Sequence, residues 1–278
     1  MKIAISCPWK RPETTLADGT VFVARYDPQA DWVVDIASFL RDELFSELSR
    51  QYPREKRIWS ATEPTAYLRL TSEMVAKISS WYGHVFAWHQ QLQRLPQYRL
   101  WHMGTSWVQW EPGPPKFGVG AMFSGKRNGS NPMYPNYPNY PGYDLRARIA
   151  EKANEITIPK AIFNGSNPRL PTKQPALEWM FHLAVENVEE PGYFSEKLID
   201  CFICRSIPIY WGDPMVGSVF ASDGIIPLDP QNFVAQCNSL TPELYSSKLA
   251  AIEENWRRAQ RYRSLECNLV ATIREMTA

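Results

Sequence analysis

The chain has 278 residues, 44% of them hydrophobic and 21% charged, which suffices for one large domain or two ordinary ones. The formal net charge of +1 argues against a nucleic-acid partner. No apolar stretch reaches the roughly 18 to 20 residues of a membrane span, and the first strand-like residues are too few for a signal peptide. We therefore expect a cytoplasmic protein. Arginines near the C-terminus leave open a weak, peripheral contact with the inner membrane surface.

The five cysteines are odd in number and scattered, which argues against a disulfide framework. Cys201 and Cys204 form a Cys-x-x-Cys pair, but they lie in an apolar run without a second pair or a nearby histidine. We expect buried thiols and no zinc site.

Short apolar runs alternate with amphipathic segments along the first part of the chain, which is typical of α/β proteins with parallel sheets. The apolar spacing predicts helices over 37–50 and 71–82, with Thr71 as an N-cap of the second. Strands are predicted at 2–6, 32–36, 57–61, 84–88 and 99–102.

A Pro-rich run, Glu111 to Pro115, follows and reads as an inter-domain linker because it cannot sustain a helix or a central strand. The segment 131–143 is dense in proline and tyrosine and predicts an extended surface loop, either packed on its own domain or serving as an active-site lid. The remaining predicted elements are strands at 117–123, 157–163, 180–186, 206–211 and 224–228, and helices at 143–154, at 194–204 and from 242 onward.

This order predicts two Rossmann-like domains that face each other across a cleft, where the carboxyl ends of both sheets would bind ligands. We expect a first domain over 1–112 and a second over 116–245. A C-terminal helical segment, 246–278, follows, and it can pack back on the first domain.

The most informative segment runs from Phe181 to Asp200 and continues from Ser206 to Pro214. It describes a buried strand that ends in Glu186 and Asn187, a Pro-Gly turn, and a helix that Ser195 or a neighbour could cap. A helix N-terminus carries free N–H groups and partial positive charge, so it suits phosphate, and Lys197 adds a full charge. Glu196 would repel phosphate and is better suited to ribose hydroxyls.

These residues resemble the donor signature of the α1,3-fucosyltransferases of glycosyltransferase family 10. That signature runs F-x-L-x-x-E-N, then Y-x-[ST]-E-K, then [IV]-P-[IV]-x-x-G, and the last run here resembles bacterial members. The matching positions are Phe181, Leu183, Glu186, Asn187, Tyr193, Ser195, Glu196, Lys197, Ile207, Pro208, Ile209 and Gly212. The resemblance implies a GT-B fold, GDP-fucose as co-substrate and an acceptor glycan as partner.

The resemblance also implies residue roles. Glu196 would hold the ribose, Lys197 the pyrophosphate, and Asn187 and Tyr193 would line the donor pocket. Arg146 would be a second phosphate ligand, with Arg148 as the alternative if the register is off by two. Further candidates are Glu186 and the basic pair Lys126 and Arg127, which occupies a loop whose usual Ser-Asn pair is replaced here.

Inverting transfer needs a carboxylate that takes the proton of the acceptor hydroxyl. The resemblance implies a base in the N-terminal domain, after a strand that faces the cleft. Glu63 is the best candidate, because it follows an apolar strand and precedes Pro64. Glu111 and Glu73 are weaker candidates, and a capping or surface role for Glu63 stays open.

No Asp-x-Asp stands at a strand end, so we expect no metal and no further cofactor. The function expected is metal-independent, inverting transfer of fucose from GDP-fucose to a glycan hydroxyl, with an α1,3 linkage to a GlcNAc-type sugar. A different nucleotide sugar on the same fold is one alternative, and a catalytically weak glycan-binding relative is another. The near-neutral charge disfavours a DNA-modifying glucosyltransferase.

Overall fold

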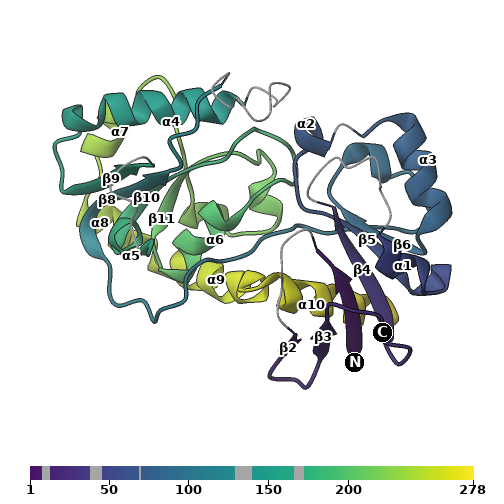
Figure 1. Cartoon of the computed structure of the whole chain (residues 1–278). Helices are drawn as coiled ribbons and strands as arrows, with labels where there is room; N and C mark the ends of the chain where they lie inside the picture. The colour runs from purple at the N-terminus through teal and green to yellow at the C-terminus, as the bar shows by residue number, and fades with distance from the viewer. Residues whose placement is uncertain (8–12, 38–45, 69, 129–139, 166–171) are drawn as a thin grey trace. The chain divides into compact units, whose positions relative to one another are not determined.

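A computed structural model of the chain describes residues 1–7, 13–37, 46–68, 70–128, 140–165 and 172–278. The chain forms two compact units (Figure 1). The first comprises Met1–Met103 and Glu266–Ala278, and the second comprises Gly104–Leu265.

The first unit is built on a sheet of seven described strands in the order β2-β3-β1-β4-β5-β6-β7. All neighbours pair in parallel except β2 and β3. The strands are β1 (Lys2–Ser6), β2 (Thr14–Thr15), β3 (Val21–Val23), β4 (Trp32–Ala37), β5 (Arg57–Ala61), β6 (His84–Ala87) and β7 (Tyr98–Leu100). The helices before residue 103 are α1 (Glu47–Arg50), α2 (Thr65–Leu68) and α3 (Ser72–Trp81). Short turns of 3-10 helix lie at Arg54–Lys56 and Gln90–Leu92.

The second unit has five described strands, all parallel, in the order β12-β11-β10-β8-β9. They are β8 (Lys116–Phe123), β9 (Lys160–Asn164), β10 (Trp179–Val185), β11 (Ile207–Trp211) and β12 (Ile226–Pro227). Its helices are α4 (Pro141–Glu151), α5 (Gln174–Leu177), α6 (Glu196–Ile203), α7 (Phe233–Asn238), α8 (Pro242–Ser247) and α9 (Leu249–Ala259). Turns of 3-10 helix lie at Ala153–Glu155, Val216–Ser218, Ser222–Gly224 and Gln260–Tyr262. The α/β class with parallel sheets is confirmed.

In both sheets the next parallel strand along the chain is added on one side of the first, and the strands after it are added on the other side, so the order reverses there. In the first unit β3 lies on one side of β1 and β4 on the other; in the second, β9 and β10 flank β8 in the same way. In sheets of this kind, ligands bind outside the carboxyl ends of the strands at that reversal point. The reversal in the second unit lies between Phe123, at the end of β8, and Val185, at the end of β10.

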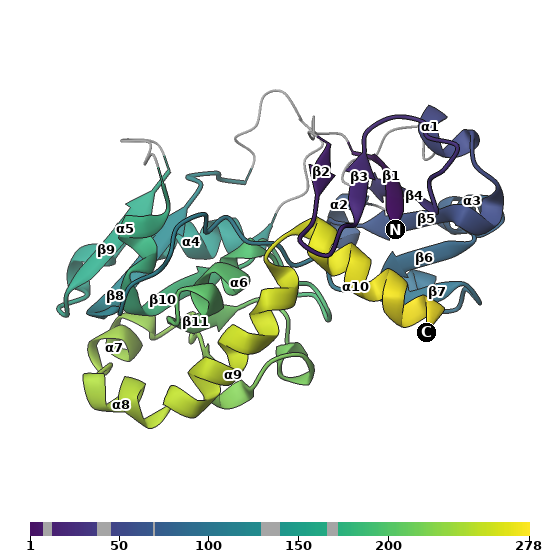
Figure 2. The ribbon, with the colours of Figure 1, turned by 90° about the horizontal axis from the view of Figure 1, so that it is seen from below.

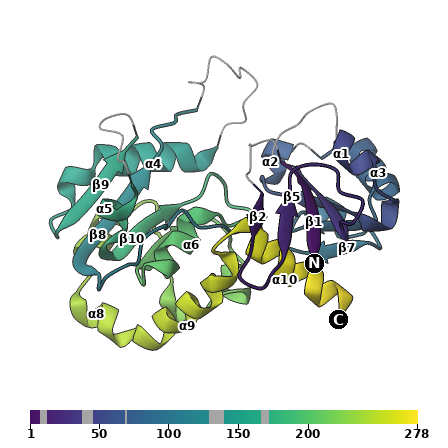
Figure 3. The ribbon, with the colours of Figure 1, turned by 60° about the horizontal axis from the view of Figure 1, so that its bottom comes forward.

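Helices cover both faces of the second sheet. One core joins α4, α7 and α8 to Val119, Leu183 and Val185 of the strands, and another joins α6 to Ala184 and Tyr210. Figure 3 shows α6 and α9 side by side in this unit, where they are in contact. The alternating apolar side chains of β10 therefore face two different helix layers.

The boundary between the two units lies at Met103–Gly104, whereas the sequence predicted it at 112–116. Residues 104–115 belong to the second unit, because Trp107 donates its backbone N–H to Asp200 Oδ1 at 2.8 Å and Val108 packs in the α6 core. The Pro-rich run is thus an internal loop before β8.

The C-terminal helical segment predicted over 246–278 is not one continuous helix. The 3-10 turn at Gln260–Tyr262 interrupts it. Helix α9, before that turn, packs in the core of the second unit through Ile252. Only α10 (Leu265–Thr277) joins the first unit (Figure 2). There Asn268 Nδ2 donates to the His102 carbonyl at 2.7 Å, and Arg274 pairs with Asp18 at 2.7 Å.

Two predictions fall wholly or largely outside the described residues: the helix over 37–50, of which α1 is the described part, and the loop 131–143, of which 140–143 are described. Within the described ranges, none of the helices combines the length and apolar character that crossing a bilayer requires.

Candidate donor site

The N-terminus of α6 is built around a buried carboxylate. Ser195 caps the helix, as predicted, and the Glu186 side chain at the end of β10 is fully buried beneath it. Glu186 Oε1 accepts from Ser195 N at 2.8 Å, and Oε2 accepts from Ser195 Oγ at 2.7 Å. A buried carboxylate needs such partners, so Glu186 fixes where the helix starts relative to the strand.

Lys197 stands one residue into the helix and completes this arrangement. Its Nζ lies 2.9 Å from Ser195 Oγ, 3.2 Å from Glu196 Oε1 and 3.4 Å from Glu186 Oε2. Burial alone would lower the pKa of Lys197, but Glu196 and Glu186 outweigh it and raise the pKa above its ordinary value. Lys197 is therefore a permanent cation at the helix N-terminus.

Glu196 is ionised for the converse reason. Burial raises its pKa, but Lys197 and Lys173 outweigh that effect and lower the pKa to about 2. The carboxylate is acceptor-only across the physiological range. This is the state that a ribose diol requires.

Arg146 reaches the same strand end from α4. Its guanidinium donates from Nε to the Val185 carbonyl at 3.0 Å and from Nη2 to Asn187 Oδ1 at 2.8 Å. Burial lowers the pKa of Arg146, with Glu186 opposing that shift, and a guanidinium keeps its charge even so. Nη1 takes no part in these contacts, so the cation can still serve a ligand.

The close approach of α4 to β10 depends on Gly142. A Cβ at this position would lie 1.9 Å from the Glu186 carbonyl oxygen, so any side chain would push the helix away. The predicted Pro-Gly turn is present as well, with Gly192 at φ +83°. Tyr193 follows that turn and is buried.

The remaining basic candidates lie elsewhere. Arg148 is exposed on α4, because positions two apart on a helix face nearly opposite directions. Lys126 and Arg127 are exposed after β8, and Arg127 pairs with Glu151 at 3.3 Å. The structure thus gathers Arg146, not Arg148, with Lys197.

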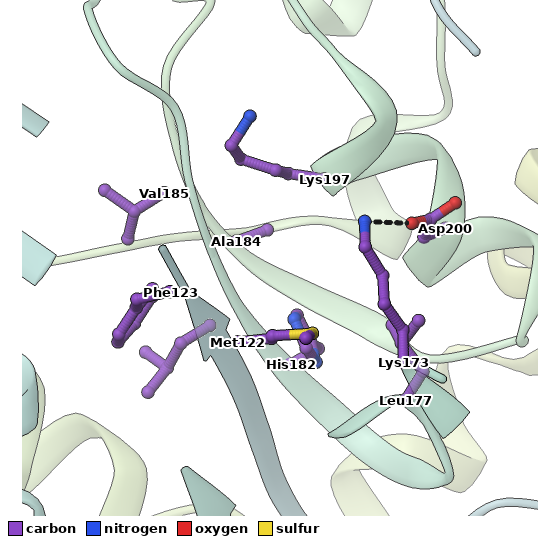
Figure 4. A pocket seen from close by; sticks show the side chains of 10 residues that line it. Met122, Phe123, Lys173, Leu177, His182, Ala184, Val185, Lys197 and Asp200 are labelled. Atoms are coloured by element: carbon purple, nitrogen blue, oxygen red, sulfur yellow. Dashed lines mark hydrogen bonds and ion pairs between the residues drawn. The ribbon is translucent and has the colours of Figure 1, made fainter. Parts of the chain in front are cut away.

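A small pocket lies at the reversal point between β8 and β10, with a cavity volume of about 20 Å³ and an opening to solvent (Figure 4). Lys173 and Asp200 form an ion pair at 2.7 Å within its lining, and the Lys197 side chain points away from that pair. Residues lining the pocket are Met122, Phe123, Lys173, Leu177, His182, Leu183, Ala184, Val185, Lys197 and Asp200.

The Lys173–Asp200 pair was not among the sequence-based candidates. One signal was present: Asp200 interrupts the apolar run of α6, and a carboxylate on a buried helix face must have partners. The sequence did not indicate which residue is the partner of Asp200, because Lys173 lies 27 residues away.

His182 on β10 is buried and carries a neutral imidazole. Its Nδ1 lies 2.9 Å from the Ala176 carbonyl, which must be accepting, so the ring proton is on Nδ1. Burial lowers its pKa to about 4.

Glu63, the candidate base, lies in the first unit just after β5, as the sequence indicated. Its backbone carbonyl is 2.9 Å from Nε2 of the buried His89, which follows β6. Of the weaker candidates, Glu73 is exposed on α3 and pairs with Lys77 at 2.7 Å, and Glu111 is exposed in the second unit. Glu111 therefore does not belong to the unit in which the base was sought.

Cations, a helix N-terminus and an ionised carboxylate thus meet at one sheet edge of the second unit. This combination suits a ligand with a diphosphate and a diol. Within the described ranges, no three His, Cys, Asp or Glu side chains gather as a metal-ligand set. The cysteines described are free thiols, with Cys201, Cys204 and Cys237 buried.

The fold is that of the GT-B α1,3-fucosyltransferases. A solved structure titled as an α1,3-fucosyltransferase with GDP superposes with a TM-score of 0.50 and 13% identity, over 95% of this chain and 90% of that one. No protein-family model matches the chain.

Two curated relatives share short segments with this chain. The α-(1,3)-fucosyltransferase FucT of Helicobacter pylori is 39% identical over 57 residues, which is 20% of this chain and 10% of that protein. The protein R654 of Acanthamoeba polyphaga mimivirus, named as a fucosyltransferase, is 56% identical over 39 residues, 14% of this chain and 6% of its own length. The matched segments cover a tenth or less of the length of each of these two relatives. The resemblance to α1,3-fucosyltransferases is confirmed in fold and in these segments.

Proposed function

We propose that the protein is a glycosyltransferase that moves fucose from GDP-fucose to a hydroxyl of an acceptor glycan. The observation that carries this proposal is the grouping of Lys197, Arg146 and Glu196 at the start of α6, on a fold shared with α1,3-fucosyltransferases. In this reaction the leaving group is GDP, whose developing negative charge must be stabilised.

The residues of the second unit divide this work. Lys197 and Arg146 bind the diphosphate. Their interaction with it strengthens as the bond to the sugar breaks, because negative charge develops on the diphosphate. Glu196 accepts hydrogen bonds from the ribose hydroxyls, while Asn187 and Tyr193 line the pocket. Glu186 acts through the helix cap, since both of its oxygens are taken by Ser195 and Lys197.

We propose Glu63 as the general base. Attack by the acceptor hydroxyl on the anomeric carbon, opposite to the leaving GDP, inverts that centre, and the hydroxyl proton passes to the Glu63 carboxylate. The proposed acceptor is a GlcNAc-type sugar that receives an α1,3 linkage. The reaction is proposed to need no metal, because arginine, lysine and the helix N-terminus supply the positive charge.

The test is incubation with GDP-fucose and a panel of N-acetyllactosamine and core-type acceptors, followed by measurement of GDP release and acceptor mass. A mass gain of one deoxyhexose with equimolar GDP is expected. Binding without turnover would favour the glycan-binding alternative, and turnover only with another nucleotide sugar would reassign the donor. A thermal-shift panel of nucleotide sugars separates these outcomes.

A further inference from the structure

Trp107 is exposed and yet firmly anchored. Its side chain is 59% exposed, and it is the only tryptophan among the large hydrophobic side chains that the described part of the chain leaves in solvent. Lys173 Nζ stands 4.2 Å from the ring centroid, so a cation occupies one face of the indole.

The anchor is the buried carboxylate of Asp200. Its Oδ1 accepts from the Trp107 backbone N–H at 2.8 Å and from Ser106 Oγ at 2.9 Å, and its Oδ2 accepts from Lys173 Nζ at 2.7 Å. One carboxylate therefore fixes both the backbone of Trp107 and the cation that packs on its ring. An exposed side chain held in this way loses little further entropy when it binds a ligand.

The position of Trp107 relative to the proposed donor site follows from α6. Asp200 lies one helical turn, about 5.4 Å, beyond Glu196 on the same face of the helix. Lys173 lines the pocket together with Lys197, and it also contributes to lowering the pKa of Glu196. In a nucleoside diphosphate, the ribose is the group between phosphate and base. Because Lys173 packs on the indole and lines the same pocket as Lys197, the Trp107 ring stands beside the lining of this pocket, where the base would extend from the ribose.

We propose that Trp107 is the nucleobase platform of the donor site, on which the purine ring of a nucleoside diphosphate stacks. This inference rests on the proposed function and adds a residue to its site. Aromatic side chains stack any base, because every base has a π-face, so Trp107 contributes affinity and other groups contribute the choice of base. The neighbouring Lys173, paired with Asp200, keeps the indole in place.

The experiment compares Trp107→Ala, Trp107→Phe and Trp256→Ala in calorimetric titrations with GDP, with ADP and with pyrophosphate alone. Alanine keeps the backbone N–H that Asp200 binds, so the anchor survives. Trp256 is the matched control, because Arg205 packs over its ring at the same 4.2 Å, but Arg205, unlike Lys173, does not line the pocket.

Trp107→Ala should weaken GDP binding roughly 5- to 150-fold, the usual effect of removing a base-stacking ring. Pyrophosphate affinity should stay unchanged, Trp107→Phe should recover most of the loss, and Trp256→Ala should behave as wild type. ADP affinity, which we expect to be weaker than that of GDP, should fall by the same factor.

Three outcomes overturn the platform. Unchanged GDP affinity in Trp107→Ala would show that the base does not stack on Trp107. A raised acceptor KM at unchanged GDP affinity would assign the ring to the acceptor sugar instead. An equal loss of GDP and pyrophosphate affinity would mean that Trp107 is structural. Failure of the wild-type protein to bind any nucleoside diphosphate is a different result, because it refutes the proposed function itself.

Discussion

The two units share the order of their central parallel strands but differ in the side chains that stand at the carboxyl edge of each sheet. In the second unit, Glu186, Glu196, Lys197 and Arg146 form a network of charges at the start of α6. In the first, the described carboxyl ends of β5 and β6 lead to a contact between the His89 ring and the backbone carbonyl of Glu63. The same topology thus locates a ligand edge in each unit, while the side chains decide its chemistry.

A functional division follows from this difference. The charge-dense edge suits a ligand with several negative charges, whereas Glu63, the proposed base, follows β5 at the other edge. Under the proposed function, substitutions at the carboxyl edge of the second unit should change donor binding, and substitutions at that of the first unit should change transfer alone.

The largest effect is expected at Glu63. Glu63→Gln should lower transfer to the acceptor by roughly 10² to 10⁴, the usual contribution of a general base. GDP affinity should be almost unchanged, and slow hydrolysis of the donor by water should survive. Steady-state kinetics together with calorimetry check both. Near-normal transfer would clear Glu63, and a joint loss of GDP binding would show a structural role.

Lys197→Ala tests the other edge. Loss of a charge-assisted contact to a diphosphate costs roughly 2 to 4 kcal/mol, or about 30- to 1,000-fold in donor use. Arg146→Ala should act in the same direction. Arg148→Ala is the matched control, since Arg148 is exposed two positions further along α4 and should leave donor kinetics as in wild type. Unchanged donor kinetics in Lys197→Ala would refute the phosphate site.

The two buried histidines should make both units acid-sensitive. Burial lowers the pKa of His89 and of His182 to about 4, whereas the unfolded chain titrates near 6.5. Below pH 6.5 the unfolded state binds protons that the native state does not, so stability falls as pH drops from 6.5 towards 4. We expect a loss of roughly 1 to 2 kcal/mol per histidine at pH 5.

Thermal unfolding at pH 7.5 and pH 5 measures this loss. His89→Gln and His182→Asn keep a side-chain N–H in the place of the bonded ring nitrogen but do not titrate. Each should reduce the acid-induced shift in melting temperature. If both variants show the full wild-type shift, other groups carry the acid sensitivity.

The smallest effect expected is that of chelation. GDP should bind with the same affinity in the presence and absence of EDTA, because the positive charge at α6 comes from side chains and the helix. It should also bind more tightly than UDP or ADP, as the resemblance to fucosyltransferases implies. Calorimetry checks this. A strict requirement for Mn²⁺ would contradict the metal-free mechanism and, with it, the division of labour between the two edges.

The elements of regular structure were largely predictable from the sequence. Buried parallel strands read as short apolar runs, and the predicted strand at 117–123 is β8 (Lys116–Phe123). The short strands β2 and β3 were missed, because two or three residues give no measurable period.

By itself, the sequence determined the chemistry available at the start of α6. A serine cap, a glutamate and a lysine adjacent in the chain stay adjacent in any helix, so Ser195, Glu196 and Lys197 had to form one local group. Glu63 likewise had to follow a strand, because the apolar run before it ends there.

Only the tertiary structure decided which distant residues join that group. It buries Arg146 and leaves Arg148 exposed, and it draws Lys173 and Trp107 to Asp200 across 27 and 93 residues. It also divides the C-terminal helical segment between the two units. The physical reason is that a local pattern shows that a side chain needs a partner, whereas the partner itself is selected by the packing of the whole sheet and its helices.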